Sequence, residues 1–184
     1  MGAEDYNVIY QGTGKKVGKG TVIIQGKENY KDSRKLYYEI KLKNGQVFIQ
    51  SGYKYQYLGG NEAAILGSNY KKRTSIKIPD RIQLGGKKVK VVKVKAKAFA
   101  NYKELVTVKI GKNITKIERQ AFAGDKKLKK CIFTSRAVTS FGKDTWKGIA
   151  KTASFYVPKK YVNHYKKLFT KKSGFVKKMK IKRK

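Results

Sequence analysis

Few side chains in this chain of 184 residues could carry out acid–base, nucleophilic or metal chemistry. It has one histidine, His164, and one cysteine, Cys131, so His–His metal sites, cysteine metal clusters and internal disulfides are excluded. The 11 acidic residues are scattered along the sequence, whereas a glycosidase needs two carboxyl groups that face each other across the substrate. We therefore predict no catalytic residue, no metal site and no cofactor, and we expect the protein not to be an enzyme.

A glycine- and lysine-rich stretch, residues 12–21, invites comparison with a phosphate-binding loop. Three residues separate Gly14 from Gly18, whereas that loop needs four, and Gly20 stands where a Mg²⁺-binding Ser or Thr is required. We therefore interpret this stretch as a β-turn punctuated by glycines.

Positive charge dominates the chain, with 46 Lys and Arg against 11 Asp and Glu and a net charge of +35. A field of this size attracts polyanions. Forty of the basic residues are Lys and six are Arg, and Lys lacks the planar fork with which Arg reads guanine or clamps phosphate. The composition favours a generic cationic surface that binds an anionic polysaccharide, a cell-wall polymer or an anionic membrane surface. Two alternatives stay open: a nucleic-acid-binding protein, whose affinity would fall steeply with salt, and a compositional bias toward Lys.

The elements that must position this charge are repeated. The pair Ala98-Phe99 recurs as Ala121-Phe122 after 23 residues and as Thr145-Trp146 after 24 more. Within one copy, residues 106–110 alternate between apolar and polar side chains, which is typical of a strand with one buried face. A turn at residues 111–113 and a short helical or 3₁₀ segment at residues 118–122 complete the copy. One copy cannot bury its own apolar face, so the copies must stack into a solenoid with a continuous core.

Residues 105–128, LVTVKIGKNITKIERQAFAGDKKL, resemble the BspA-like leucine-rich repeats of bacterial surface proteins. The shared features are a strand, a pair of isoleucines and a closing Ala-Phe before a Leu, and the resemblance covers roughly residues 70–165. Cys131, Thr145 and Trp146 depart from the family pattern. The resemblance implies a mainly β leucine-rich-repeat solenoid with short helical turns. It also implies a non-enzymatic, secreted or cell-surface module for adhesion-type binding of a protein or an anionic glycan, with a signal peptide upstream of this sequence.

The C-terminal region is predicted to close the solenoid. Pro158 suits the first turn of a helix, and four side chains fall on one face of that helix: Tyr161, Tyr165, Leu168 and Phe169. We expect this helix to cap the last apolar layer, with His164 on its surface, and residues 171–184 to form a basic tail. No apolar stretch approaches the ~18 residues of a membrane-spanning helix, and we expect a monomer.

Residues 1–43 have a different pattern, with strand-like alternation at Tyr6–Tyr10, Thr21–Ile24 and Leu36–Leu42. They resemble the last strands of an immunoglobulin-like module of bacterial exported proteins. They are either part of such a module or an N-terminal cap of the solenoid. The predicted organisation is residues 1–43, then residues 44–170 as the solenoid with its capping helix, then the tail at residues 171–184.

Aligned copies place two columns of side chains on the outward face of the strands. One column is Lys77, Lys109, Ile132 and Tyr156, and the other is Ser75, Thr107, Lys130 and Ser154. In stacked repeats such columns commonly line the binding surface, and lysines beside a tyrosine suit acidic or glycan ligands. The predicted ligand-binding residues are therefore Ser75, Lys77, Thr107, Lys109, Lys130 and Tyr156. Lys77, Lys109 and Lys130, with Tyr156 beside them, are expected to form a row of like charge; the alternative is a plain solvated sheet face.

Overall fold

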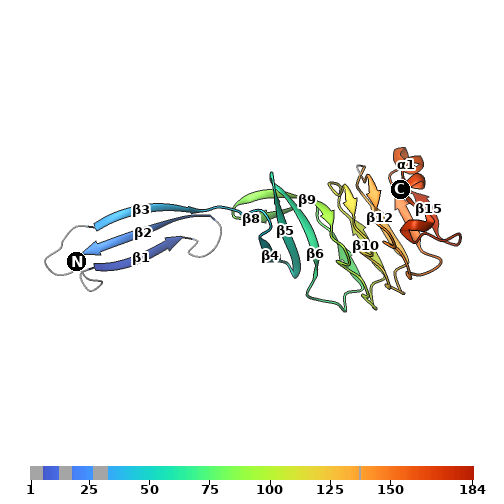
Figure 1. Cartoon of the computed structure of the whole chain (residues 1–184), viewed down its shortest axis with the longest axis horizontal. Helices are drawn as coiled ribbons and strands as arrows, with labels where there is room; N and C mark the ends of the chain where they lie inside the picture. Colours follow the sequence, from blue (N-terminus) through green and yellow to red (C-terminus); the bar gives the residue numbers. More distant parts are fainter. Residues whose placement is uncertain (1–5, 13–17, 27–32, 137) are drawn as a thin grey trace. The chain divides into compact units, whose positions relative to one another are not determined.

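The computed structural model describes residues 6–12, 18–26, 33–136 and 138–184 (Figure 1). The chain divides into two compact units. One unit comprises residues 1–43 and 83–87, and the other comprises residues 44–82 and 88–184. The repeats predicted from the sequence lie in the second unit.

The first unit contains a three-stranded antiparallel sheet in the order β1-β2-β3. Its strands are β1 (Tyr6–Gly12), β2 (Gly18–Gly26) and β3 (Ser33–Ile40). The three strands expected in this region are thus present. Assignment of this sheet to an immunoglobulin-like module stays a prediction.

One sheet of the second unit contains five parallel strands in the order β15-β14-β12-β10-β7. The strands are β7 (Ser75–Lys77), β10 (Thr107–Ile110), β12 (Lys130–Phe133), β14 (Ser154–Val157) and β15 (Lys180–Arg183). The register places Val108 opposite Ile76 on one side and opposite Cys131 on the other. These are the residues that the repeat alignment predicts to be equivalent, so the repeat register is confirmed.

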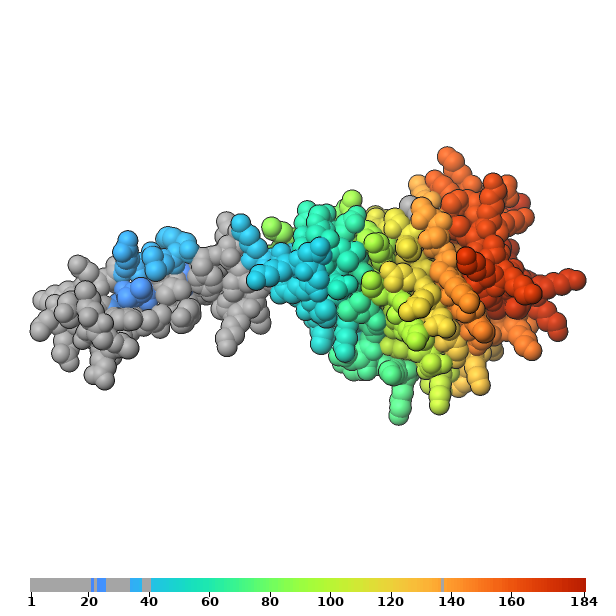
Figure 2. All heavy atoms as spheres, in the orientation of Figure 1, coloured from blue at the N-terminus to red at the C-terminus, as the bar shows by residue number. Residues whose placement is uncertain are grey.

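The second sheet runs in the order β13-β11-β9-β6-β5-β4, and β8 also pairs with β9. Its strands are β4 (Val47–Gln50), β5 (Tyr53–Gly59), β6 (Glu62–Ser68), β8 (Arg81–Leu84), β9 (Lys87–Val94), β11 (Lys116–Ile117) and β13 (Ser140–Phe141). Strands β6, β9, β11 and β13 are parallel, whereas β4, β5 and β6 pair antiparallel. The copies that begin at β10 and β12 each add one strand to both sheets, which is the stacking that a solenoid requires. Figure 2 shows the copies following one another in chain order along the stack.

The core between the two sheets contains a column of stacked aromatic rings. Phe99, Phe122 and Trp146 are all fully buried. The ring centroid of Phe122 lies 5.5 Å from that of Phe99 and 5.0 Å from that of Trp146, with interplanar angles of 13° and 1°. The repeated aromatic position therefore fills each layer, and Trp146 fits the column although it departs from the repeat pattern.

The short helical segment predicted at residues 118–122 is wrong, because the chain forms turns there. Gln120 has a φ of 56°, and its repeat equivalents Lys97 and Asp144 both have a φ of 58°. A left-handed residue interrupts an α-helix. The backbone N–H of Gln120 donates instead to the carbonyl oxygen of Lys143 in the next copy, at 3.0 Å. Each turn thus exchanges helical hydrogen bonds for bonds between copies.

The capping helix is present as a 3₁₀ turn (Lys159–Tyr161) followed by α1 (Val162–Leu168). Tyr165 and Phe169 are buried, and the hydroxyl of Tyr165 donates to the carbonyl oxygen of Ser135 at 2.8 Å. The ring centroid of Phe169 lies 4.4 Å from the ring centroid of Phe155. The helix therefore covers aromatic side chains of the last repeats.

Residues 171–184 differ from the expected free tail. They contain a 3₁₀ turn at Lys171–Ser173 and strand β15, which pairs in parallel with β14. The backbone N–H of Trp146 donates to the carbonyl oxygen of Ser173 at 2.9 Å. In the preceding copy, the backbone N–H of Phe122 donates in the same way to the carbonyl oxygen of Thr145 at 3.1 Å. These residues therefore form a further, lysine-rich copy of the repeat.

Candidate functional site on the five-stranded sheet

The outward side chains of the five-stranded sheet form two rows across its strands. Row 1 consists of Ser75, Thr107, Lys130, Ser154 and Lys180. Row 2 consists of Lys77, Lys109, Ile132, Tyr156 and Lys182. The two columns predicted from the sequence coincide with these rows.

The structure separates one residue from the predicted row of like charge. Lys77 and Lys109 are direct neighbours in row 2, but Lys130 lies opposite Thr107 in row 1. Lys130 begins strand β12, whereas Lys109 is the third residue of β10, so a repeat offset places the two in different rows. Lys130 and Tyr156 meet across the two rows, because the Nζ of Lys130 lies 5.4 Å from the centre of the Tyr156 ring.

Tyr156 is contacted by a second lysine that the sequence analysis placed in the tail. The Nζ of Lys182 lies 5.5 Å from the centre of the same ring, within the ~6 Å range of a cation–π interaction. The sequence signal for this strand was the alternation of Met179, Lys180, Ile181 and Lys182. Its excess of lysine concealed the pattern.

The two rows stand above a fully buried layer of apolar side chains. The inward residues Val108, Ile110, Cys131, Phe133 and Phe155 are fully buried. Lys77, Lys109 and Lys130 are exposed, and Thr107 and Tyr156 are half-buried. Rows 1 and 2 contain five lysines, Lys77, Lys109, Lys130, Lys180 and Lys182, and no carboxylate. Such a surface can bind anions and stack on sugar rings, and it offers no acid–base pair.

One ionisable residue that the sequence analysis missed is buried in the core. Asp125 is the repeat equivalent of Tyr102 and Ile149, and its side chain is fully buried. Its Oδ1 accepts a hydrogen bond from the backbone N–H of Tyr102 at 2.8 Å, whereas its Oδ2 has no hydrogen-bond partner among the described residues. Burial raises the pKa of this carboxyl to about 8. The sequence signal for this buried carboxyl was an aspartate at a repeat position where the other copies have Tyr102 and Ile149.

The two other side chains considered for chemistry, Cys131 and His164, are each held by contacts within the repeats. Cys131 is fully buried, and burial raises the pKa of its thiol. His164 lies on the exposed side of α1, with its Nε2 2.6 Å from the carbonyl oxygen of Val138. Among the residues that the structure describes, no group of three or more His, Cys, Asp or Glu side chains could hold a metal ion. Within the same residues, no helix has the length and hydropathy needed to cross a membrane.

Comparisons with known proteins agree with this architecture. The family described as BspA type Leucine rich repeat region matches residues 68–184 in six copies. A comparison with curated proteins finds no match. The family match reaches the C-terminus, so it includes the strand that replaces the expected tail.

Two solved structures share the fold. A leucine rich cell surface protein from Faecalibacterium prausnitzii A2-165 is 19% identical with a TM-score of 0.53, and the match covers 64% of this chain and 38% of that protein. The pneumococcal vaccine antigen PcpA is 20% identical with a TM-score of 0.59, and the match covers 78% of this chain and 39% of that protein. This chain therefore spans well under half the length of either structure. Because the family match covers more than half of the chain and coincides with the stacked strands, this protein belongs to the BspA-type leucine-rich-repeat family.

Proposed function

We propose that the chain is a non-enzymatic interaction module of a bacterial cell surface, and that rows 1 and 2 bind an anionic polymer or an acidic protein surface. The observation that carries the proposal is the pair of rows, with five lysines and Tyr156 on one face of the five-stranded sheet. None of these lysines forms an ion pair with a described residue. The fold shared with a cell surface protein supports the same location.

The electrostatics of row 2 favour a bound anion. Neighbouring strands lie about 4.8 Å apart, so Lys77 and Lys109, which are directly opposite each other, repel one another. Charges this close lie within the ~8 Å screening length at physiological ionic strength. An anion above the row offsets this repulsion, and Tyr156 adds an aromatic contact for a sugar ring.

The test is a triple variant, K77Q/K109Q/K130Q, assayed against polyglutamate, a sulfated oligosaccharide and duplex DNA at several salt concentrations. Its affinity for the first two should fall, and the slope of log affinity against log salt should decrease by roughly one for each lysine that contacts the polymer. Duplex DNA tests the nucleic-acid alternative, because a DNA-binding protein would prefer it to the other two probes.

The matched control removes three exposed lysines elsewhere, K126Q/K151Q/K166Q. Lysines of the C-terminal segment are unsuitable controls, since Lys180 and Lys182 belong to the two rows. Equal losses in both variants would show that net charge alone drives binding and that the rows form no site.

We also propose that the natural protein is exported and that residues 1–43 are part of an immunoglobulin-like module. The antiparallel pairing of β1, β2 and β3 supports the second point. Surface labelling of intact cells tests the location, and labelling only after lysis would contradict it. The structure of a longer natural chain tests the module, because a second sheet should pack on β1, β2 and β3.

A further inference from the structure

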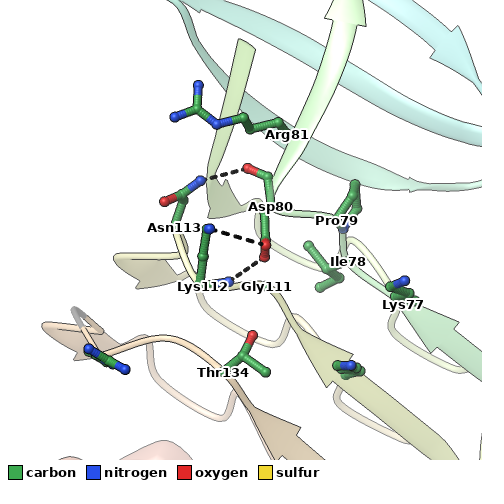
Figure 3. A pocket seen from close by; sticks show the side chains of 11 residues that line it. Lys77, Ile78, Pro79, Asp80, Arg81, Gly111, Lys112, Asn113 and Thr134 are labelled. Carbon is green, nitrogen blue, oxygen red and sulfur yellow. Dashed lines mark hydrogen bonds and ion pairs between the residues drawn. The ribbon is translucent and has the colours of Figure 1, made fainter. Parts of the chain in front are cut away.

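A basic hollow lies where row 2 ends, beyond the carboxyl ends of β7 and β10 (Figure 3). It has a volume of about 760 Å³, which is within the ~300–1,000 Å³ range of small-molecule sites. The segments that follow β7, β10 and β12 form its walls. Its cationic lining residues are Lys77, Arg81, Lys109, Lys112 and Arg136.

The one carboxylate of the hollow is already engaged. The Oδ1 of Asp80 accepts a hydrogen bond from the backbone N–H of Lys112 at 2.6 Å, and its Oδ2 lies 4.0 Å from the Nζ of Lys112. Figure 3 shows Lys112 and Asn113 turned toward Asp80. The other four cations, Lys77, Arg81, Lys109 and Arg136, form no ion pair with a described residue. The hollow therefore has an excess of positive charge that its own carboxylate leaves unbalanced.

The walls are held together before any ligand arrives. The side-chain amide of Asn113 donates to the backbone carbonyl oxygen of Asp80 at 2.8 Å. The hydroxyl of Thr134 donates to the backbone carbonyl oxygen of Ile110 at 2.7 Å. Gly111 packs so closely that a Cβ there would lie 2.8 Å from the carbonyl oxygens of both Ile78 and Pro79. A site built in advance loses less ordering entropy on binding.

Arginine distinguishes this hollow from the general excess of lysine. The chain has six Arg among 46 basic residues, and two of the six, Arg81 and Arg136, line the hollow. A second hollow contains Lys97 and Lys147, and a third contains Lys71, Lys72 and Lys103 with Glu104; neither contains arginine. The planar guanidinium fork binds two oxygens of a phosphate or sulfate group at once, whereas lysine is a point charge.

We propose that this hollow binds a tetrahedral ester oxyanion, a phosphate or sulfate group carried by a sugar or polyol polymer. Arg81 and Arg136 supply the forked donors, and Lys77 and Lys109 supply charge. Because Lys77 and Lys109 also belong to row 2, one ester of a polymer that runs along the row can enter the hollow. The inference rests on the proposed function and specifies its ligand.

The test preserves charge and removes only the forks. The R81K/R136K variant keeps the net charge, and the matched control R34K/R119K makes the same change at two exposed arginines outside the hollow. The probes are a glycerol-phosphate oligomer, a sulfated oligosaccharide and a polyglutamate of equal charge. R81K/R136K should weaken ester binding roughly tenfold, because two forks become point charges. A carboxylate can also accept hydrogen bonds from both arms of a fork, but it lacks the further oxygens of a tetrahedral group, so polyglutamate binding should weaken less. The ester that binds more tightly to the unmodified protein identifies the source of the oxyanion.

An equal loss for all three probes, or a loss no larger than in R34K/R119K, would overturn the inference. A further variant, K130Q/Y156A, changes the rows and leaves the hollow intact, because neither residue lines it. In one outcome, K130Q/Y156A binds the polymers more weakly while R81K/R136K keeps the same affinity for the ester probes relative to polyglutamate. This result refutes the hollow and keeps the proposed function. The reverse pattern refutes the rows and keeps the hollow. Melting curves of all variants identify any loss of folding.

Discussion

The buried carboxyl of Asp125 makes the stability of the protein depend on pH in a direction opposite to that of a paired aspartate. Its side chain is fully buried and its Oδ2 has no hydrogen-bond partner among the described residues. Burial raises its pKa from 3.8 to about 8, although the backbone amides of Tyr102 and Asn101 act in the opposite sense. Between these two values the folded state holds a proton that the unfolded state has lost. The contribution of Asp125 to the free energy of unfolding therefore falls as the pH rises through this interval.

The size of the effect follows from the two pKa values. Each pH unit over which only the folded state holds the proton lowers the free energy of unfolding by about 1.4 kcal/mol. The rise from 3.8 to about 8 thus predicts a loss on the order of 5 kcal/mol between pH 4 and pH 8. The contribution is fully present below pH 4 and is lost as the pH passes through 8.

Asp125→Asn isolates this contribution. The asparagine oxygen can still accept from the N–H of Tyr102, and the amide carries no charge at any pH. Urea unfolding followed by the fluorescence of Trp146, the one tryptophan of the chain, measures the free energy at pH 5, 6, 7, 8 and 9 in constant salt. We expect the free energy of unfolding of D125N to rise relative to that of the unmodified protein as the pH increases from 5 to about 8, and the difference to stay constant above that value.

Asp144→Asn is the control, since it makes the same chemical change at a half-buried turn residue. The pH profile of D144N shows the effect of removing one carboxyl group outside the core. A D125N profile that runs parallel to that of the unmodified protein would refute the reasoning, because it would mean that the Asp125 carboxyl is ionised in the folded state throughout this range.

Three further predictions concern the stack. Phe122→Ala should lower the free energy of unfolding by about 3–5 kcal/mol, because the ring stacks between those of Phe99 and Trp146; a loss below about 1 kcal/mol would contradict the register. Deletion of residues 159–184 removes α1 and β15 and should lower the Tm or cause aggregation, and an unchanged melting curve would show that neither element protects the core. Gly45→Ala should lower the free energy of unfolding by about 1–2 kcal/mol through its left-handed backbone alone. Gly174→Ala should lower it further, because a Cβ at this position, where φ is 87°, would lie 2.5 Å from the backbone nitrogen of Lys147, whereas a Cβ at Gly45 (φ 84°) would meet no atom within 4 Å. Equal losses would disprove the close approach at Gly174.

Local patterns sufficed for the repeat register. The spacing of Phe99, Phe122 and Trp146 and the alternation of residues 106–110 predicted which side chains face the core and which face solvent. A strand has a period of two, so a single correct residue assigns its whole face. The predicted columns of outward side chains were correct for the same reason.

Patterns of one copy could not predict interactions between copies. The chain forms a turn and not a helix at Gln120, because the backbone N–H of Gln120 donates to the carbonyl oxygen of Lys143 in the next copy. No property of residues 118–122 alone reveals that acceptor. Residues 180–183 were predicted to belong to a basic tail because they are rich in lysine. They form a strand because β14 offers an edge with which they pair. The separation of Lys130 from Lys77 and Lys109 likewise depends on where neighbouring strands begin.

The sequence alone was enough to establish the stacked-repeat architecture, the absence of His–His or cysteine metal sites and the cationic character of the surface, because these depend on composition and on short-range periodicity. Tertiary structure was needed for three features: the hollow between Asp80 and Arg136, the two lysines on Tyr156 and the buried carboxyl of Asp125. Each depends on the distance between side chains or turns of different copies, or on the removal of water by several copies together. Such distances and burial arise only when the copies stack.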